Sequence, residues 1–142
     1  MEWYFQHNEF VKRIDELVHK IKASGKEYTD LFPIPRGGLV VAVYLSHRLC
    51  IPVNLDDRPN PESLIVDDIA DSGETLSYYS SNILWKRGKK TSWDTCTIHY
   101  KPTSKIKPTY YAVETEDWII YPWQTQQSSQ IDMTAHRKRS DE

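Results

Sequence analysis

The segment LIVDDIADSGETL, residues 64–76, places the strongest constraint on how this chain can fold. It begins with an uninterrupted apolar run that ends in two carboxylates, Asp67 and Asp68. Apolar residues without polar alternation are typical of a strand buried on both faces, as strands are in parallel sheets. The next residues, DSGET at 71–75, have the composition of a turn that leads into a helix. The segment therefore predicts a strand–turn–helix unit of an α/β protein.

Helical patterns lie on both sides of this segment. Apolar residues in 10–21 recur at three- and four-residue spacing, which predicts a helix with Asn8 as its N-cap and Gly25 as its C-terminal stop. Further helices are predicted over residues 39–49 and 75–87.

Strands are expected between the helices, so the pattern implies right-handed βαβ units on a mainly parallel, twisted sheet flanked by helices. The predicted strands are residues 31–34, 51–55, 64–67, 95–100 and 110–113.

A chain of 142 residues has the length of one domain. We expect residues 1–124 to form that domain. Residues 125–142 are polar and then highly charged, and we expect this tail to have little order of its own.

The composition excludes several classes of protein. The net charge of −2 argues against a general nucleic-acid binder, and no apolar run approaches the ~20 residues of a membrane span. The first ten residues lack the basic start and apolar core of an export signal, so we expect a cytoplasmic protein without a membrane partner. Cys50 and Cys96 have no metal-binding spacing and are expected to be reduced.

The acids and the turn together predict a ligand site. Open α/β sheets bind ligands at the carboxyl ends of their strands, and a helix N-terminus attracts phosphate. Gly73 would allow close approach of the backbone, and Ser72 and Thr75 would add hydroxyl donors. Carboxylates beside an anion site fit a ligand that has both phosphate and sugar hydroxyls, with Mg²⁺ between them. The alternative is that these residues only cap the N-terminus of a helix and bind no ligand. A shorter motif, such as DSG alone, would favour that alternative.

The whole string resembles the phosphoribosyl-pyrophosphate signature of the type I phosphoribosyltransferases. IPRGGLVVA, residues 34–42, resembles the pyrophosphate loop of that family. IHYKPT (98–103) and EDWIIYPW (116–123) resemble the base-binding part of bacterial xanthine–guanine phosphoribosyltransferases. The resemblance covers roughly residues 30–124, and it implies the type I phosphoribosyltransferase fold with a small base-binding hood.

The resemblance also implies an activity. Such an enzyme transfers the 5-phosphoribosyl group of phosphoribosyl pyrophosphate to N9 of a 6-oxopurine in purine salvage and releases pyrophosphate, with Mg²⁺ as cofactor. Whether the base is guanine, xanthine or hypoxanthine stays open, and the family implies a homodimer or homotetramer.

Roles follow from the resemblance residue by residue. Asp71 matches the general base or acid near purine N7, which must lose a proton as the new bond forms. Asp68 is the residue expected to reach Mg²⁺. The residues expected to bind the donor's ribose and phosphate are Asp67, Asp68, Ile69, Ala70, Asp71, Ser72, Gly73, Glu74 and Thr75.

Two further groups of residues complete the implied site. Lys101 matches a donor to the 6-oxo group, Trp118 a stacking aromatic, and Ile119 a residue whose carbonyl meets the base. The peptide bond before Arg36 is expected to be cis, as in related enzymes. The residues implied for pyrophosphate are Pro35, Arg36, Gly37 and Gly38.

Two features depart from the family pattern. The connection DDRPNPES, residues 56–63, is too short for a large lid, so the site is expected to be more open or covered by a neighbouring subunit or Arg58. Glu74 puts a negative charge beside the phosphate. These departures motivate an alternative, a regulatory module that binds the donor or a nucleotide without turnover. A third hypothesis is a nucleic-acid regulator that uses the basic run at residues 136–139.

Overall fold

A computed structural model describes residues 1–81 and 92–129 of the chain. Strands and helices alternate through the middle of the chain, as the sequence predicts. The elements are β1 (Glu2–Tyr4), α1 (His7–Ala23), β2 (Asp30–Pro33), α2 (Gly37–Leu49), β3 (Ser63–Val66), β4 (Ile69–Ala70), α3 (Glu74–Ser81), β5 (Thr95–Tyr100), β6 (Tyr110–Glu114) and β7 (Trp118–Ile120).

The main sheet contains β2, β3, β4, β5 and β6, and each of its pairings is parallel. β3 pairs with the start of β5, and β4 pairs with its end. β6 pairs along the other edge of β5. β3 and β4 therefore act as one strand, which is interrupted at Asp67 and Asp68.

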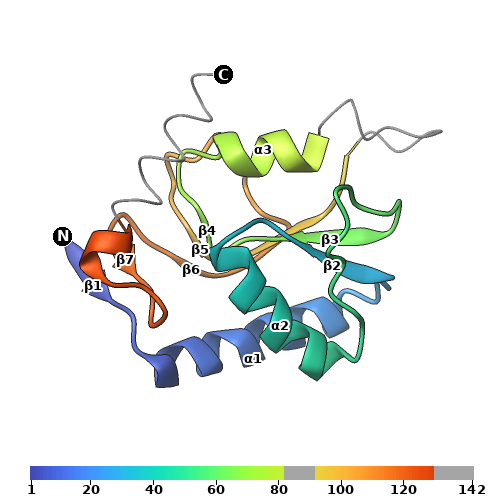
Figure 1. The fold of residues 1–142 in the computed structure, drawn as a ribbon, viewed down its shortest axis with the longest axis horizontal. Coiled ribbons are helices and arrows are strands. Elements are labelled where there is room, and N and C mark those ends of the chain that lie inside the picture. The colour runs from blue at the N-terminus through green and yellow to red at the C-terminus, as the bar shows by residue number, and fades with distance from the viewer. Residues whose placement is uncertain (82–91, 130–142) are drawn as a thin grey trace.

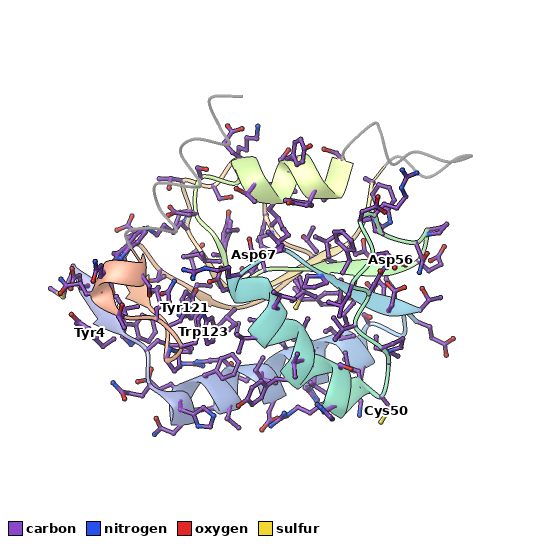
Figure 2. All side chains as sticks on the ribbon, in the orientation of Figure 1. Tyr4, Cys50, Asp56, Asp67, Tyr121 and Trp123 are labelled. Atoms are coloured by element: carbon purple, nitrogen blue, oxygen red, sulfur yellow. The ribbon has the colours of Figure 1, made fainter. Side chains whose placement is uncertain are left out.

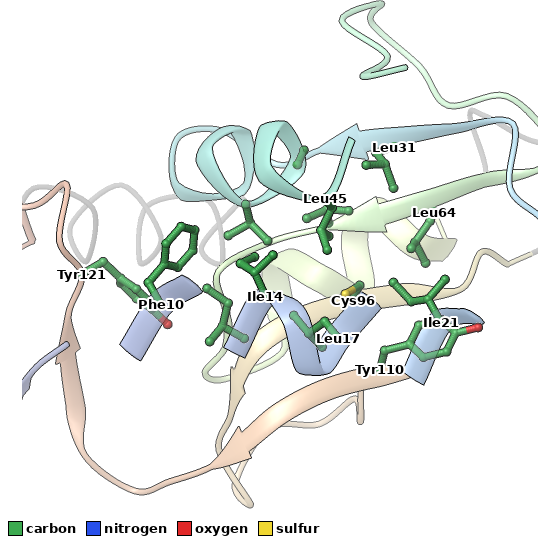
Figure 3. Packing of buried hydrophobic residues seen from close by; sticks show 14 of the residues in the cluster. Phe10, Ile14, Leu17, Ile21, Leu31, Leu45, Leu64, Cys96, Tyr110 and Tyr121 are labelled. Atoms are coloured by element: carbon green, nitrogen blue, oxygen red, sulfur yellow. The ribbon is translucent and has the colours of Figure 1, made fainter. Parts of the chain in front are cut away.

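Helices cover both faces of this sheet (Figure 1). α1 and α2 lie on one face and α3 lies on the other. The side chains of β3 alternate between these layers, because Leu64 and Val66 pack with α1 and α2 while Ile65 packs with Leu76 of α3. The prediction of a strand buried on both faces is confirmed. Figure 3 shows the larger of the two cores, between α1, α2 and the sheet.

Helix α1 confirms the predicted apolar spacing but not the predicted cap. Gln6 occupies the N-cap position without a side-chain hydrogen bond, and Asn8 lies inside the helix. Gly25 has a φ of +74°, a left-handed conformation that suits a residue just past a helix end. The buried face of α1 consists of Phe10, Ile14, Leu17 and Ile21.

The strand predicted over residues 51–55 is wrong. Only one isolated bridge forms there, between Val53 and Leu31. The Asn54 side chain accepts a hydrogen bond from the backbone N–H of Asp56 at 2.8 Å, which turns the chain away from the sheet edge. Leu55 is consequently 77% exposed.

A second, two-stranded sheet corresponds to the predicted hood. β1 pairs with β7 in parallel and lies beside it near the N-terminus (Figure 1). The backbone N–H of Phe5 continues this contact with a 2.9 Å bond to the carbonyl of Ile120. The sequence did not predict β1, because three residues are too few to show a strand period.

Some predictions lie outside the described residues. These are the end of the helix expected over 75–87 and most of the tail, from residue 130 onward. Within the described residues, no helix is both long and apolar enough to cross a membrane. Cys50 and Cys96 are free thiols, and burial raises the pKa of Cys96 to about 12.

The core predicts a contrast between two leucines. Leu17→Ala removes a side chain that is 0% exposed, so the free energy of unfolding should fall by about 3 kcal/mol. Leu55→Ala is the matched control at 77% exposure, and its effect should stay within about 0.5 kcal/mol. Urea unfolding measures both, and an equal loss would contradict the packing.

Candidate functional site

The interruption between β3 and β4 holds the acid pair at the carboxyl end of β3, a strand that lies between β2 and β5. The backbone N–H of Asp67 still bonds to the carbonyl of Cys96 at 3.0 Å. The Asp67 side chain then accepts the N–H of Asp68 at 2.8 Å, which shapes the turn. The carbonyl of Asp68 accepts the N–H groups of Ile98 and His99 at 3.0 and 3.1 Å. The backbone therefore resumes its pairing directly after the acids.

The PRGG segment packs against this interruption. The peptide bond between Pro35 and Arg36 is cis, as the resemblance to related enzymes implies. A Cβ atom on Gly37 would collide with the Asp68 carboxylate, and one on Gly38 would collide with the carbonyl of Val66. Both glycines are therefore required by close approach, and the predicted pyrophosphate loop lies beside the predicted metal-binding acid.

The turn over residues 71–75 leads into α3 as predicted. Gly73 has a φ of +85°, which disfavours any other residue, and it packs against Ser104 and Ile106. The Ser72 side chain accepts the N–H of Glu74 at 3.2 Å. Ser72 is exposed, whereas Thr75 is 7% exposed. Ser72 is therefore the more exposed of the two hydroxyl residues in this turn.

Lys101, Asp71 and Trp118, which were predicted separately, lie together at the start of the turn. The ammonium nitrogen of Lys101 lies 3.3 Å from an oxygen of Asp71. The same nitrogen lies 5.5 Å from the centre of the Trp118 ring, in cation–π geometry. The Lys101 side chain is only 13% exposed, so water screens the pair weakly. Ile119 is buried at 4% exposure and pairs with Trp3 of β1.

Tyr121 joins the hood to the acid pair, which agrees with the expectation from the sequence that it supports the site rather than contacts the base. Its hydroxyl donates to the carbonyl of Asp68 at 3.1 Å and lies 2.9 Å from Nδ1 of His99. Since the hydroxyl proton goes to the carbonyl, Nδ1 of His99 donates to Tyr121. In Figure 2, Tyr121 and Trp123 lie between the hood and helices α1 and α2.

His99 is a buried, structural residue of the core. It is 0% exposed and contacts the rings of Trp3, Phe5 and Tyr121 edge-on. Among the described residues its Nε2 has no hydrogen-bond partner. Burial, and to a smaller degree the charge of Arg13, lower the pKa of His99 to about 3.

The acids suit a magnesium ion that also binds a substrate phosphate. Over residues 1–81 and 92–129, no group of three or more His, Cys, Asp or Glu side chains gathers into a metal site. Mg²⁺ commonly uses only one or two carboxylates together with phosphate oxygens. Asp68, whose carboxylate lies against the PRGG loop, fits that mode of binding.

Comparison with known proteins identifies the family of this chain. A family model for the phosphoribosyl transferase domain matches residues 56–130. No curated protein sequence matches the chain. The chain belongs to the phosphoribosyltransferase family, and its fold is that of type I members close to the 6-oxopurine enzymes.

Solved structures of similar fold include a purine phosphoribosyltransferase from Pyrococcus horikoshii. It has a TM-score of 0.73 and 26% identity, and the match covers 87% of this chain and 94% of that one. The xanthine–guanine–hypoxanthine phosphoribosyltransferase of Helicobacter pylori has a TM-score of 0.76 and 18% identity, with 93% and 99% covered. A hypothetical protein from Neisseria gonorrhoeae, solved with bound ppGpp, has a TM-score of 0.73 and 19% identity, with 97% of each chain covered.

The lowered pKa of His99 predicts that acid destabilises the fold. Between pH 6.5 and 3 the unfolded chain binds a proton at this residue that the folded chain does not bind, so stability falls as the pH falls. At pH 5 the loss is about 2 kcal/mol relative to pH 7.5. His99→Gln should remove that part of the pH dependence in urea unfolding.

Wild type and His99→Gln are compared by urea unfolding at pH 7.5 and at pH 5. An identical acid-induced loss in wild type and His99→Gln would contradict this assignment.

Proposed function

We propose that this protein transfers the 5-phosphoribosyl group from phosphoribosyl pyrophosphate to N9 of a 6-oxopurine and releases pyrophosphate. The observation that carries the proposal is the meeting of Lys101, Asp71 and Trp118 beside the phosphate motif, at 3.3 Å and 5.5 Å. An aromatic face, an ammonium donor and a carboxylate are the groups that a flat 6-oxopurine needs. Family membership and the Pyrococcus relative support the same reaction class.

In the proposed reaction, Asp71 acts on the base and the PRGG loop acts on the leaving pyrophosphate. N9 of the base bonds to C1 of the ribose while the bond from C1 to the pyrophosphate oxygen breaks. Asp71 accepts the proton that leaves N7. Arg36 and the backbone N–H group of Gly37 stabilise the negative charge that gathers on pyrophosphate, whereas the N–H of Gly38 donates to the carbonyl of Ile34 at 2.9 Å.

The donor side of the site follows the acid pair and the turn. Asp67 and Asp68 face the ribose hydroxyls, and residues 70–75 hold the 5-phosphate. Bound to Asp68 and the donor, Mg²⁺ would supply positive charge to the pyrophosphate. The Ile119 carbonyl would meet the exocyclic position of the base. The choice among guanine, xanthine and hypoxanthine, the cytoplasmic location and the homodimer or homotetramer stay predictions.

Product formation tests the proposal. The folded protein, incubated with the donor, Mg²⁺ and each of guanine, xanthine and hypoxanthine, should form at least one nucleoside monophosphate, measured by chromatography. Removal of Mg²⁺ with EDTA should abolish the product. Absence of nucleotide with all three bases would overturn the proposal.

Substitution of Asp71 separates chemistry from binding. Asp71→Asn keeps the size of the side chain but cannot accept the N7 proton, so kcat should fall by roughly 10²- to 10⁴-fold. The affinity for the donor, measured by calorimetry, should change much less. Equal losses in kcat and in donor affinity would count against the role of Asp71.

A second candidate is a regulatory module that binds the donor or a nucleotide without turnover. The segment before β3 is held in place rather than free to close, because Asn60 bonds to Asp30 and accepts the indole N–H of Trp93 at 2.8 Å. The Neisseria protein of the same fold holds ppGpp, which also favours a nucleotide-binding role. Mg²⁺-dependent binding of the donor without product from any base would support this candidate.

A further inference from the structure

The loop that follows β5 lies directly against the phosphate turn. The backbone N–H of Lys101 bonds to the carbonyl of Ala70 at 2.9 Å, and that of Lys105 bonds to the carbonyl of Ser72 at 2.9 Å. Gly73 has no room for a side chain, because a Cβ there would come within 2.5 Å of Ser104 Oγ and 2.9 Å of Lys105 N. The position of residues 101–105 is thus fixed by backbone contacts with the turn.

Glu74 creates an electrostatic problem in this turn. It is the first residue of α3, and its N–H bonds to the side chain of Ser72. A phosphate held by residues 70–75 would meet the Glu74 carboxylate at close range, and two negative charges a few ångströms apart repel each other even in water.

Lys105 lies where it can cancel that charge. Its ammonium nitrogen is 2.9 Å from an oxygen of Glu74, and the two side chains are 51% and 46% exposed. Exposed ion pairs of this kind add little to folding stability. Their charges still act on a ligand bound next to them, so the importance of this pair lies in binding.

We propose that Lys105 is a positioning residue of the phosphate site, which neutralises Glu74 and so allows the turn to accept the donor's 5-phosphate. The inference rests on the proposed donor site. It concerns one residue that the sequence motifs did not include. Lys105 acts through Glu74, so removal of the Glu74 charge makes Lys105 unnecessary.

The test is a double-mutant comparison of the affinity for phosphoribosyl pyrophosphate with Mg²⁺, measured by calorimetry on the full chain. At low salt, Lys105→Ala should raise the Kd by roughly fivefold. The double variant Glu74→Gln with Lys105→Ala should return to within about twofold of wild type. Lys105→Arg should also bind normally, and the loss in Lys105→Ala should shrink at high salt.

Lys107→Ala is the matched control. Lys107 belongs to the same loop but lies over the Tyr111 ring, 5.6 Å from its centre, so its removal should leave the affinity unchanged. If Lys105→Ala binds the donor with wild-type affinity, the inference about Lys105 is overturned, but the proposed donor site is not. An unrescued loss in the double variant would overturn it in favour of direct contact between Lys105 and phosphate. Wild-type protein that binds no donor would overturn the proposed site as well.

Discussion

The backbone carbonyl of Asp68 is the point on which the candidate site depends. It accepts two N–H groups from β5 and the hydroxyl of Tyr121 from the chain that follows the hood strand β7. This one acceptor therefore fixes the acid pair to the sheet and the hood to the acid pair, and the Tyr121 side chain that reaches it is buried at 2% exposure. Buried polar groups are costly to leave unpaired, so the sheet and the hood are held in one arrangement.

The PRGG loop depends on the same interruption of the strand. Gly37 and Gly38 approach the Asp68 side chain and the Val66 carbonyl too closely for any Cβ atom. The backbone N–H of Ile34 donates to the Val66 carbonyl at 2.8 Å. This bond fixes the position of the PRGG loop relative to β3. A shift of the acid pair would therefore move the predicted pyrophosphate loop as well.

The sequence predicted the parts of the molecule that depend on local pattern. The buried strand β3, the spacing of apolar residues in α1 and the turn at Gly73 each have a local physical cause, and each is confirmed. The three-residue strand β1 has no such pattern, because its stability comes from pairing with β7, far along the chain. The strand expected at residues 51–55 failed because the hydrogen bond that Asn54 makes with Asp56 outweighs strand propensity.

The candidate site could be predicted residue by residue only where a motif carried the information. The contacts of Lys101 with Asp71 and Trp118 bring together three residues that the motifs named separately. The hydrogen bonds of Tyr121 and the ion pair of Lys105 depend on where the chain after β7 and the loop after β5 lie in space. No short stretch of sequence encodes either of these, so a structure was needed to find them.

Two ion pairs join the phosphate turn to the loop after β5, one at each end of their contact. Asp71 pairs with Lys101 at 3.3 Å and Glu74 pairs with Lys105 at 2.9 Å. The backbone bonds between the two segments involve neither ion pair, so they hold the segments in place independently of the side-chain charges. A base that binds here would therefore meet Asp71 and Lys101, and a phosphate would meet a Glu74 that Lys105 already neutralises, while the backbone stays where the sheet has set it.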